Sequence, residues 1–102
     1  MNNGYLGMIR QWQELFYNNR ISSATLECFP DAEKLAGAYG FKGRTIDKPQ
    51  DLAAALEEAI REPGPYLLNV KVSPYENVYP MVPAGGAINE MVMGPPQPVA
   101  VP

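Results

Sequence analysis

The residues best suited to chemistry stand at the start of the sequence, where Asn2, Asn3 and Gly4 are followed by Gly7. Amide oxygens bind hard cations such as magnesium, which also accepts backbone carbonyl and phosphate oxygens. Glycine lets a ligand approach the backbone closely, and the N-terminus of a following helix attracts phosphate. These residue types are compatible with a site for a divalent cation and a phosphate, but on spacing alone a helix cap or a turn is the more frequent use of such residues. Both interpretations stay open at this point.

An amphipathic helix is expected directly after these residues, over roughly residues 6–17. Its apolar stripe recurs at three- and four-residue steps and consists of Tyr5, Met8, Ile9, Trp12, Leu15 and Phe16. The polar residues fall mostly on the other side and are Arg10, Gln11, Gln13 and Glu14. By this pattern Trp12 is a core residue, although the wall of a cofactor site would give the same pattern. Asn18 and Asn19 suit the end of the helix, because asparagine tolerates the left-handed conformation.

The elements that would support this site follow along the chain. Pro30 and Asp31 open a helix over residues 32–39, which ends at Gly40. Strands are predicted over residues 43–46 and 66–72, and the helix between them begins near residue 51. The apolar face of that helix is Leu52, Ala55, Leu56, Ala59 and Ile60, and Pro63, Gly64 and Pro65 stop it.

A strand, a helix and a strand within thirty residues predict a βαβ unit with parallel strands. Two strands cannot make a whole buried sheet, so further strands must come from elsewhere. From Ser73 onward prolines and glycines recur, and only residues 87–93 could form a short helix. The predicted class is α/β: a partial parallel sheet with flanking helices over residues 1–72, and an irregular Pro/Gly-rich tail over residues 73–102.

Composition narrows the classes of function. The 102 residues suffice for one modest domain, and the net charge of −3 gives no basic stripe for nucleic acid or an anionic membrane. The chain has no histidine, the usual general base and transition-metal ligand, and its single cysteine, Cys28, cannot form an internal disulfide. No apolar run is long enough for a membrane helix. The acids are scattered, so we predict no catalytic residue in this chain.

Four blocks in order resemble one family: NNGYLGMIRQWQELFY, FPDAEKLAGAYG, KPQDLAAALEEAI with EPGPYLLNVKV, and ENVYPMVPAGGAINEM. Together they resemble the C-terminal part of the thiamine-diphosphate-binding domain in the large catalytic subunit of acetolactate synthase, a transferase of branched-chain amino-acid biosynthesis. The similarity runs from residue 1 to about residue 93. The LGMIRQWQ and YPMVPAGGA blocks are the most specific to this family.

The resemblance implies roles for individual residues. Asn3 would be the second side-chain ligand of the magnesium that anchors thiamine diphosphate, with the backbone carbonyl of Tyr5 as a further ligand. Gly4, Leu6 and Gly7 would lie along the diphosphate, and Met8 would pack against the cofactor. The substrate and inhibitor channel would be lined by Ile9, Trp12, Pro83, Ala84 and Gly85. Trp12 would favour 2-ketobutyrate over pyruvate as the acceptor.

The resemblance also implies parts that this chain does not contain. In the family, the first magnesium ligand is the aspartate of a GlyAspGly motif that precedes the asparagines. The glutamate that activates the cofactor belongs to another domain of a partner subunit, and FAD is bound by a separate middle domain. We therefore expect a fragment that is inactive alone. The parent would be a cytoplasmic homodimer or tetramer with a regulatory subunit, or a plastid enzyme if a transit peptide precedes it. The alternatives are a non-catalytic remnant that pairs its strand edges with another chain, and a piece of another thiamine-dependent decarboxylase.

Overall fold

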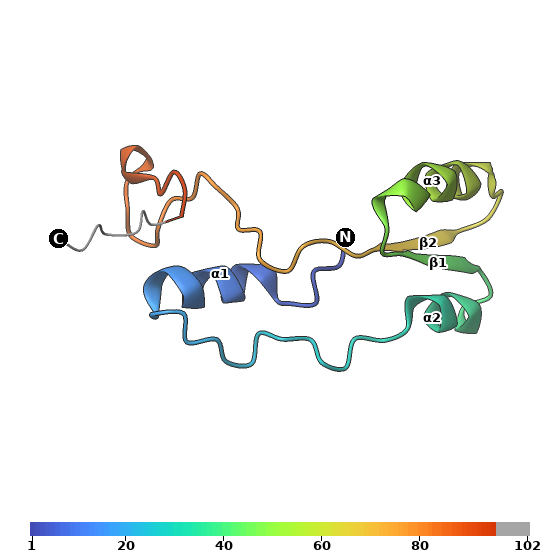
Figure 1. Cartoon of the computed structure of the whole chain (residues 1–102), viewed down its shortest axis with the longest axis horizontal. Coiled ribbons are helices and arrows are strands. Elements are labelled where there is room, and N and C mark those ends of the chain that lie inside the picture. The colour runs from blue at the N-terminus through green and yellow to red at the C-terminus, as the bar shows by residue number, and fades with distance from the viewer. Residues whose placement is uncertain (96–102) are drawn as a thin grey trace. The chain divides into compact units, whose positions relative to one another are not determined.

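The computed structural model describes residues 1–95 and divides the chain into two compact units (Figure 1). The first, which we call the sheet unit, consists of Met1–Tyr5 and Thr25–Tyr75. The second, which we call the helix unit, consists of Leu6–Ala24 and the chain from Glu76 onward. The end of the predicted tail, residues 96–102, lies outside the described residues. The predicted division after residue 72 concerns the domain of a larger protein and stays a prediction.

The sheet unit contains the predicted βαβ arrangement. Strand β1 covers Lys42–Ile46, helix α3 covers Leu52–Arg61 after a 3-10 turn at Pro49–Asp51, and strand β2 covers Tyr66–Val70. The strands are parallel and in register from Lys42 opposite Tyr66 to Ile46 opposite Val70. The prediction of parallel strands is thus confirmed. The second strand is shorter than predicted, because beyond Val70 only Lys71 still pairs, in an isolated bridge.

Helix α2, Ala32–Ala38, begins and ends by local interactions that the sequence predicts. The Asp31 carboxylate accepts hydrogen bonds from the backbone N–H groups of Glu33 and Lys34, at 3.0 and 3.1 Å. These bonds lower the pKa of Asp31, the Lys34 N–H most strongly, because they favour the ionised form. After the helix, Gly40 adopts the left-handed conformation with φ +78°.

The apolar face predicted for α3 is only partly buried. Ala55 is fully buried and belongs to a small core with Ala32, Ala36 and Ile46. Ile60, by contrast, is 82% exposed. The apolar face lies where the sequence predicts it, but within the described residues two strands cover too little of the helix to bury it.

The outer edge of β1 is covered by a side chain from α2. The backbone N–H of Thr45 donates a 2.8 Å hydrogen bond to the Glu33 carboxylate. Behind it, α2 lies so close to β1 that a Cβ atom on Gly43 would stand 2.8 Å from the Cβ atom of Ala36. Glu33 thus satisfies one of the groups that an open strand edge presents to other chains.

The helix unit is built on α1, which covers Gly7–Phe16, one residue shorter at each end than predicted. Asn18 and Asn19 follow it in the left-handed conformation, both with φ 55°, as the sequence predicts. The segment from residue 76 is irregular, with one antiparallel bridge between Met81 and Val92 and a 3-10 turn at Ile88–Glu90. That turn is all that forms of the short helix predicted over residues 87–93.

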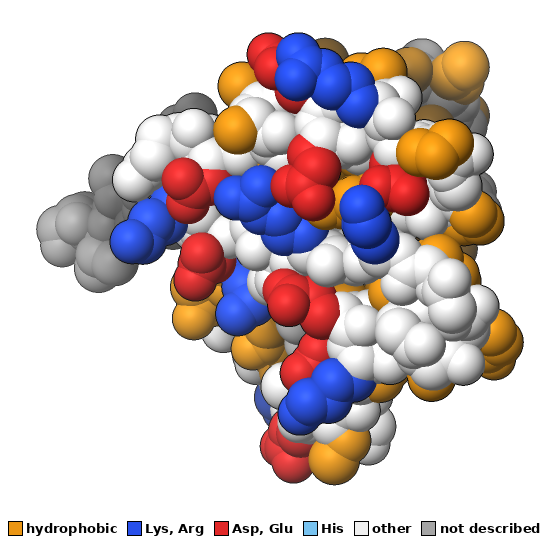
Figure 2. Space-filling view, turned by 90° about the vertical axis from the view of Figure 1, so that its right-hand side faces the viewer, with side chains coloured by type: hydrophobic (Ala, Val, Ile, Leu, Met, Phe, Trp, Pro, Cys, Tyr) orange, Lys and Arg blue, Asp and Glu red, His pale blue; other side chains and the backbone are white. Residues whose placement is uncertain are grey.

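Charged side chains of both signs intermingle on the face shown in Figure 2. The ion pairs of the sheet unit include Lys42–Glu62 at 2.6 Å, Arg44–Glu58 at 2.9 Å and Arg61–Glu57 at 3.2 Å. The hydrogen bond that Lys42 Nζ donates to the Glu62 carboxylate raises the pKa of Lys42, because it favours the charged ammonium. Within residues 1–95, no helix is long and apolar enough to cross a membrane.

Candidate functional site

The two asparagines lie at the carboxyl end of the parallel sheet. Asn2 pairs with Lys71, directly after β2: its N–H donates to the Val70 carbonyl at 2.8 Å, and its carbonyl accepts from Val72 N–H at 3.0 Å. Lys71 N–H in turn donates to the Ile46 carbonyl of β1. Asn2 therefore pairs along the edge of β2 that β1 does not occupy, in the position of a third strand. The carboxyl ends of strands are where open α/β sheets bind ligands.

Local hydrogen bonds orient the side chain of Asn3. Its Oδ1 atom accepts from the backbone N–H of Tyr5 at 3.1 Å, and Asn2 Oδ1 accepts from Gly4 N–H at 2.9 Å. Each asparagine thus forms a side-chain turn. An amide oxygen has two lone pairs, so Oδ1 of Asn3 retains acceptor capacity beyond this bond. Gly4 has φ +72°, and no atom lies within 4 Å of the place where its Cβ would stand.

In the helix unit, the N-terminus of α1 offers donors for an anion. The N-cap residue Leu6 makes no side-chain cap hydrogen bond, and the first turn after Gly7 holds no acidic residue. The first N–H groups of a helix have no partner within the helix, and its dipole places partial positive charge there. This end of α1 therefore suits a phosphate.

The apolar stripe of α1 is exposed in the described chain, which corrects the interpretation of Trp12 as a core residue. Trp12 is 44% exposed. It borders an open hollow of about 680 Å³, whose lining is Met8, Ile9, Trp12, Gln13, Tyr17 and Arg20. A second hollow, of about 170 Å³, is lined by Trp12, Phe16, Tyr17, Pro83 and Ala84. Trp12 is thus shared by both hollows.

Two of the three predicted channel residues of the tail, Pro83 and Ala84, therefore border the same hollow as Trp12 within the helix unit. Pro83 and Ala84 line the smaller hollow, and Gly85 follows them in a tight turn in which Gly86 N–H donates to the Pro83 carbonyl at 2.9 Å. Gly85 holds φ +78° there, a conformation that favours glycine. Gly85 itself does not line either hollow.

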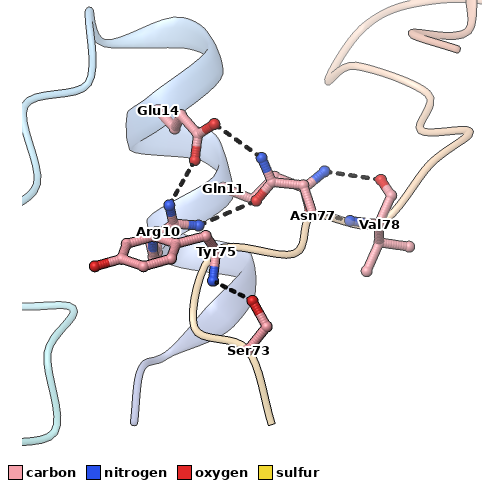
Figure 3. Close-up of polar contacts among 7 residues, drawn as sticks. All are labelled: Arg10, Gln11, Glu14, Ser73, Tyr75, Asn77 and Val78. Atoms are coloured by element: carbon pink, nitrogen blue, oxygen red, sulfur yellow. Dashed lines mark hydrogen bonds and ion pairs between the residues drawn. The ribbon is translucent and has the colours of Figure 1, made fainter. Parts of the chain in front are cut away.

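The polar side of α1, which an amphipathic helix normally turns toward solvent, is the side that the unit buries. Gln11 is 1% exposed and Arg10 is 7% exposed. Arg10 pairs with Glu14 at 2.9 Å and donates to Asn77 Oδ1 at 3.2 Å, and Asn77 Nδ2 donates to Glu14 at 3.0 Å (Figure 3). Burying these polar groups is tolerable because they satisfy one another. The residue types alone could not reveal this, because Asn77 is more than sixty positions away.

Sequence reasoning also missed further contributors to the hollows, among them Tyr17 and Arg20. Arg20 Nε donates to the Tyr17 carbonyl at 3.2 Å, which places it beside the helix end. The only available signal was their position just past the apolar stripe. Among residues 1–95, no group of three or more His, Cys, Asp or Glu side chains could hold a metal ion.

Comparison with known proteins identifies similar sequences. Residues 1–70 match the family model described as thiamine pyrophosphate enzyme, C-terminal TPP binding domain. The acetolactate synthase isozyme 2 large subunit of Escherichia coli is 44% identical over 92 residues, which are 90% of this chain and 17% of that protein. The acetolactate synthase large subunit of Pyropia yezoensis is 46% identical over 93 residues, 90% of this chain and 16% of that protein. This chain thus spans about a sixth of the length of these relatives.

Proposed function

Because this chain belongs to the family of thiamine pyrophosphate enzymes, through their C-terminal TPP-binding domain, we propose that it is part of an acetolactate synthase large subunit. The parent reaction joins two pyruvates, or pyruvate and 2-ketobutyrate, with loss of carbon dioxide, on the route to valine, leucine and isoleucine. The observation that carries the proposal is the pairing of Asn2 with Lys71, directly after β2, because it brings the chain that continues into Asn3 and Gly4 to the carboxyl end of the sheet.

The residues present fit the magnesium and diphosphate end of the cofactor. Asn3 offers an oriented amide oxygen and Tyr5 a backbone carbonyl, the ligand types that Mg²⁺ prefers together with phosphate oxygens. Gly4 leaves space for close approach, and Leu6 and Gly7 stand at the uncapped end of α1. Met8 is the next exposed apolar side chain of that helix and would pack on the cofactor. Bound thiamine diphosphate supplies the carbon nucleophile and accepts the electron pair left by decarboxylation.

The apolar residues of the helix unit would bound the path of the keto acids. Trp12 and Ile9 line the larger hollow, and Pro83 and Ala84, followed by Gly85, lie against Trp12 in the smaller one. An apolar wall excludes water and favours the acceptor with the longer carbon chain, which is 2-ketobutyrate. The same proposal assigns further properties to the parent enzyme: bound FAD, a homodimeric or tetrameric assembly, a regulatory subunit and a cytoplasmic location.

A chimeric enzyme tests the proposal. The 92 matched residues of this chain replace the corresponding segment of the Escherichia coli relative, and acetolactate formation is measured. We expect an active chimera. Asn3→Ala should raise the Mg²⁺ concentration needed for half-maximal activity by at least about 100-fold. Residues that only support metal ligands have effects of up to about 100-fold on metal affinity, and the loss of a direct ligand should be no smaller.

Asn2→Ala is the matched control, because Asn2 carries the same side chain and makes the same type of turn one residue earlier. Its backbone, not its side chain, pairs beside β2, so the Mg²⁺ dependence should change little. A folded chimera without activity, or equal Mg²⁺ dependence of the two variants, would refute the proposal. The isolated 102-residue chain should form no acetolactate, and measurable formation would contradict its assignment as an incomplete site.

A further inference from the structure

Two glutamines flank Trp12, and each holds one distant backbone residue at two points. Gln11 Oε1 accepts from Val78 N–H at 2.7 Å, and Gln11 Nε2 donates to the Val78 carbonyl at 2.9 Å. Gln13 repeats the arrangement with Ser22: its Oε1 accepts from Ser22 N–H at 3.1 Å, and its Nε2 donates to the Ser22 carbonyl at 2.9 Å. All four residues belong to the helix unit.

The two held segments are those that border the hollows at Trp12. Val78 precedes the stretch that contains Pro83 and Ala84, which line the smaller hollow. Ser22 follows Arg20, which lines the larger hollow. Gln11 Nε2 also approaches the sulfur of Met81 at 3.1 Å, which adds a second contact on the way to Pro83. Each glutamine therefore anchors a different wall.

We propose that Gln11 and Gln13 are positioning residues that fix the two walls of the hollows on either side of Trp12. A primary amide offers one acceptor and two donors, so a single side chain can satisfy both backbone groups of one residue, as a neighbouring strand does. The two anchors differ in burial: Gln11 is 1% exposed, whereas the bonds of Gln13 lie at the surface. The anchor at Val78 is therefore the less exposed of the two to competition from water.

Amide hydrogen exchange of the full chain tests this inference residue by residue. Gln11→Met preserves the length of the side chain and removes both hydrogen bonds, so exchange at Val78 N–H should rise about fivefold or more. Exchange at Ser22 N–H should stay unchanged. Gln13→Met should give the reverse pattern. Unprotected Val78 and Ser22 amides in the unmodified chain, or equal effects of both variants on both amides, would overturn the proposal.

Trp12, the only tryptophan, gives a spectroscopic readout of the walls. Loss of either anchor should shift Trp12 emission to longer wavelength and increase its quenching by acrylamide. Glu57→Met on α3 is the control, because it introduces the same side chain at an exposed site of the sheet unit. A Trp12 emission that responds equally to all three substitutions, or to none, would contradict the positioning role.

Gln11→Glu separates hydrogen bonding from packing. Glutamate keeps an acceptor for Val78 N–H, whereas methionine keeps only the shape, so Glu should preserve more of the protection at Val78. Protection that is preserved better by Met than by Glu would assign Gln11 a packing role only and overturn the proposal.

The consequence for substrate choice rests on the proposed function. In the active chimera, Gln11→Met should shift the ratio of kcat/KM for 2-ketobutyrate against pyruvate by up to about tenfold, a discrimination comparable to the smallest effect of one methylene group in a pocket. Gln11 lines neither hollow, so such a shift reports the position of the wall and not a changed lining. An unchanged ratio would refute this consequence. An inactive chimera together with the expected exchange pattern would refute the proposed function and leave the positioning role standing.

Discussion

Replacing Gly43 by alanine should loosen the contact between α2 and β1. The new Cβ would stand 2.8 Å from Ala36 Cβ, and 3.3 Å from both the Ala32 carbonyl oxygen and Glu33 Cα. These are backbone and short side-chain atoms that cannot rotate away, so the helix itself must move. Inserting a methyl group into such packing costs about 1–3 kcal/mol. The lower entropy of an unfolded chain without this glycine offsets about 0.5–1 kcal/mol.

The net expectation is a loss of about 1–2 kcal/mol in the free energy of unfolding of the sheet unit. With a urea dependence of about 1–2 kcal/mol per molar, the midpoint should fall by about 1 M. Circular dichroism at the helix band follows the transition. Amide exchange at Thr45, whose N–H is held by Glu33, reports the same loosening locally.

Gly37→Ala is the matched control in the neighbouring helix. Gly37 lies inside α2, and nothing stands within 4 Å of the position of its added Cβ. Alanine is the better helix former by about 1 kcal/mol, so this variant should be more stable than the parent chain. If Gly43→Ala also unfolds at equal or higher urea, then α2 does not pack on β1 at the distance described, and the reasoning fails.

Three further perturbations test other contacts of the sheet unit. Gly4→Ala should lower the free energy of unfolding by about 1–2 kcal/mol in a urea titration, because φ +72° is strained for alanine, and Gly4→Asn should lower it less. Folding lowers the pKa of Asp31. The cap that its carboxylate forms therefore stabilises α2 fully at pH values above the unfolded pKa of about 3.9, and this stabilisation is lost as the pH falls through the lower pKa of the folded state. Asp31→Asn should keep the cap and remove this acid dependence of helix content, and an unchanged acid profile would contradict it. Glu33→Ala should leave the Thr45 N–H at the outer edge of β1 without its hydrogen bond and should increase self-association in sedimentation experiments. A variant with unchanged sedimentation would show that Glu33 does not protect this strand edge.

Local signals in the sequence predicted the helices, the strands and several of their ends. The carboxylate of Asp31 caps the helix that it precedes, and Asn18 and Asn19 adopt the left-handed conformation after α1. The parallel βαβ unit also follows from segment order and spacing. These features depend on residues within a few positions of one another, so the chain near each residue determines them. The resemblance of its blocks to acetolactate synthase likewise needed no coordinates.

The tertiary structure alone decided which face of α1 is buried. Periodicity separates an apolar stripe from a polar one, but it does not say which stripe meets the rest of the chain. Here Asn77 and Val78 satisfy Arg10, Gln11 and Glu14 from more than sixty residues away, so the polar side is buried. Trp12 is left at the hollows instead of in a core.

The candidate metal residue shows the same division. The family resemblance of the sequence blocks, and not the residue types alone, proposed Asn3 as a magnesium ligand. Only the pairing of Asn2 with Lys71 placed Asn2, and the chain that continues into Asn3, at the carboxyl end of the sheet. Asn2 and Lys71 are far apart in the sequence and are brought together by folding. Long-range hydrogen bonds between backbone groups carry no signature in residue type, and this is the physical reason why the sequence could propose Asn3 as a ligand but could not locate it in the fold.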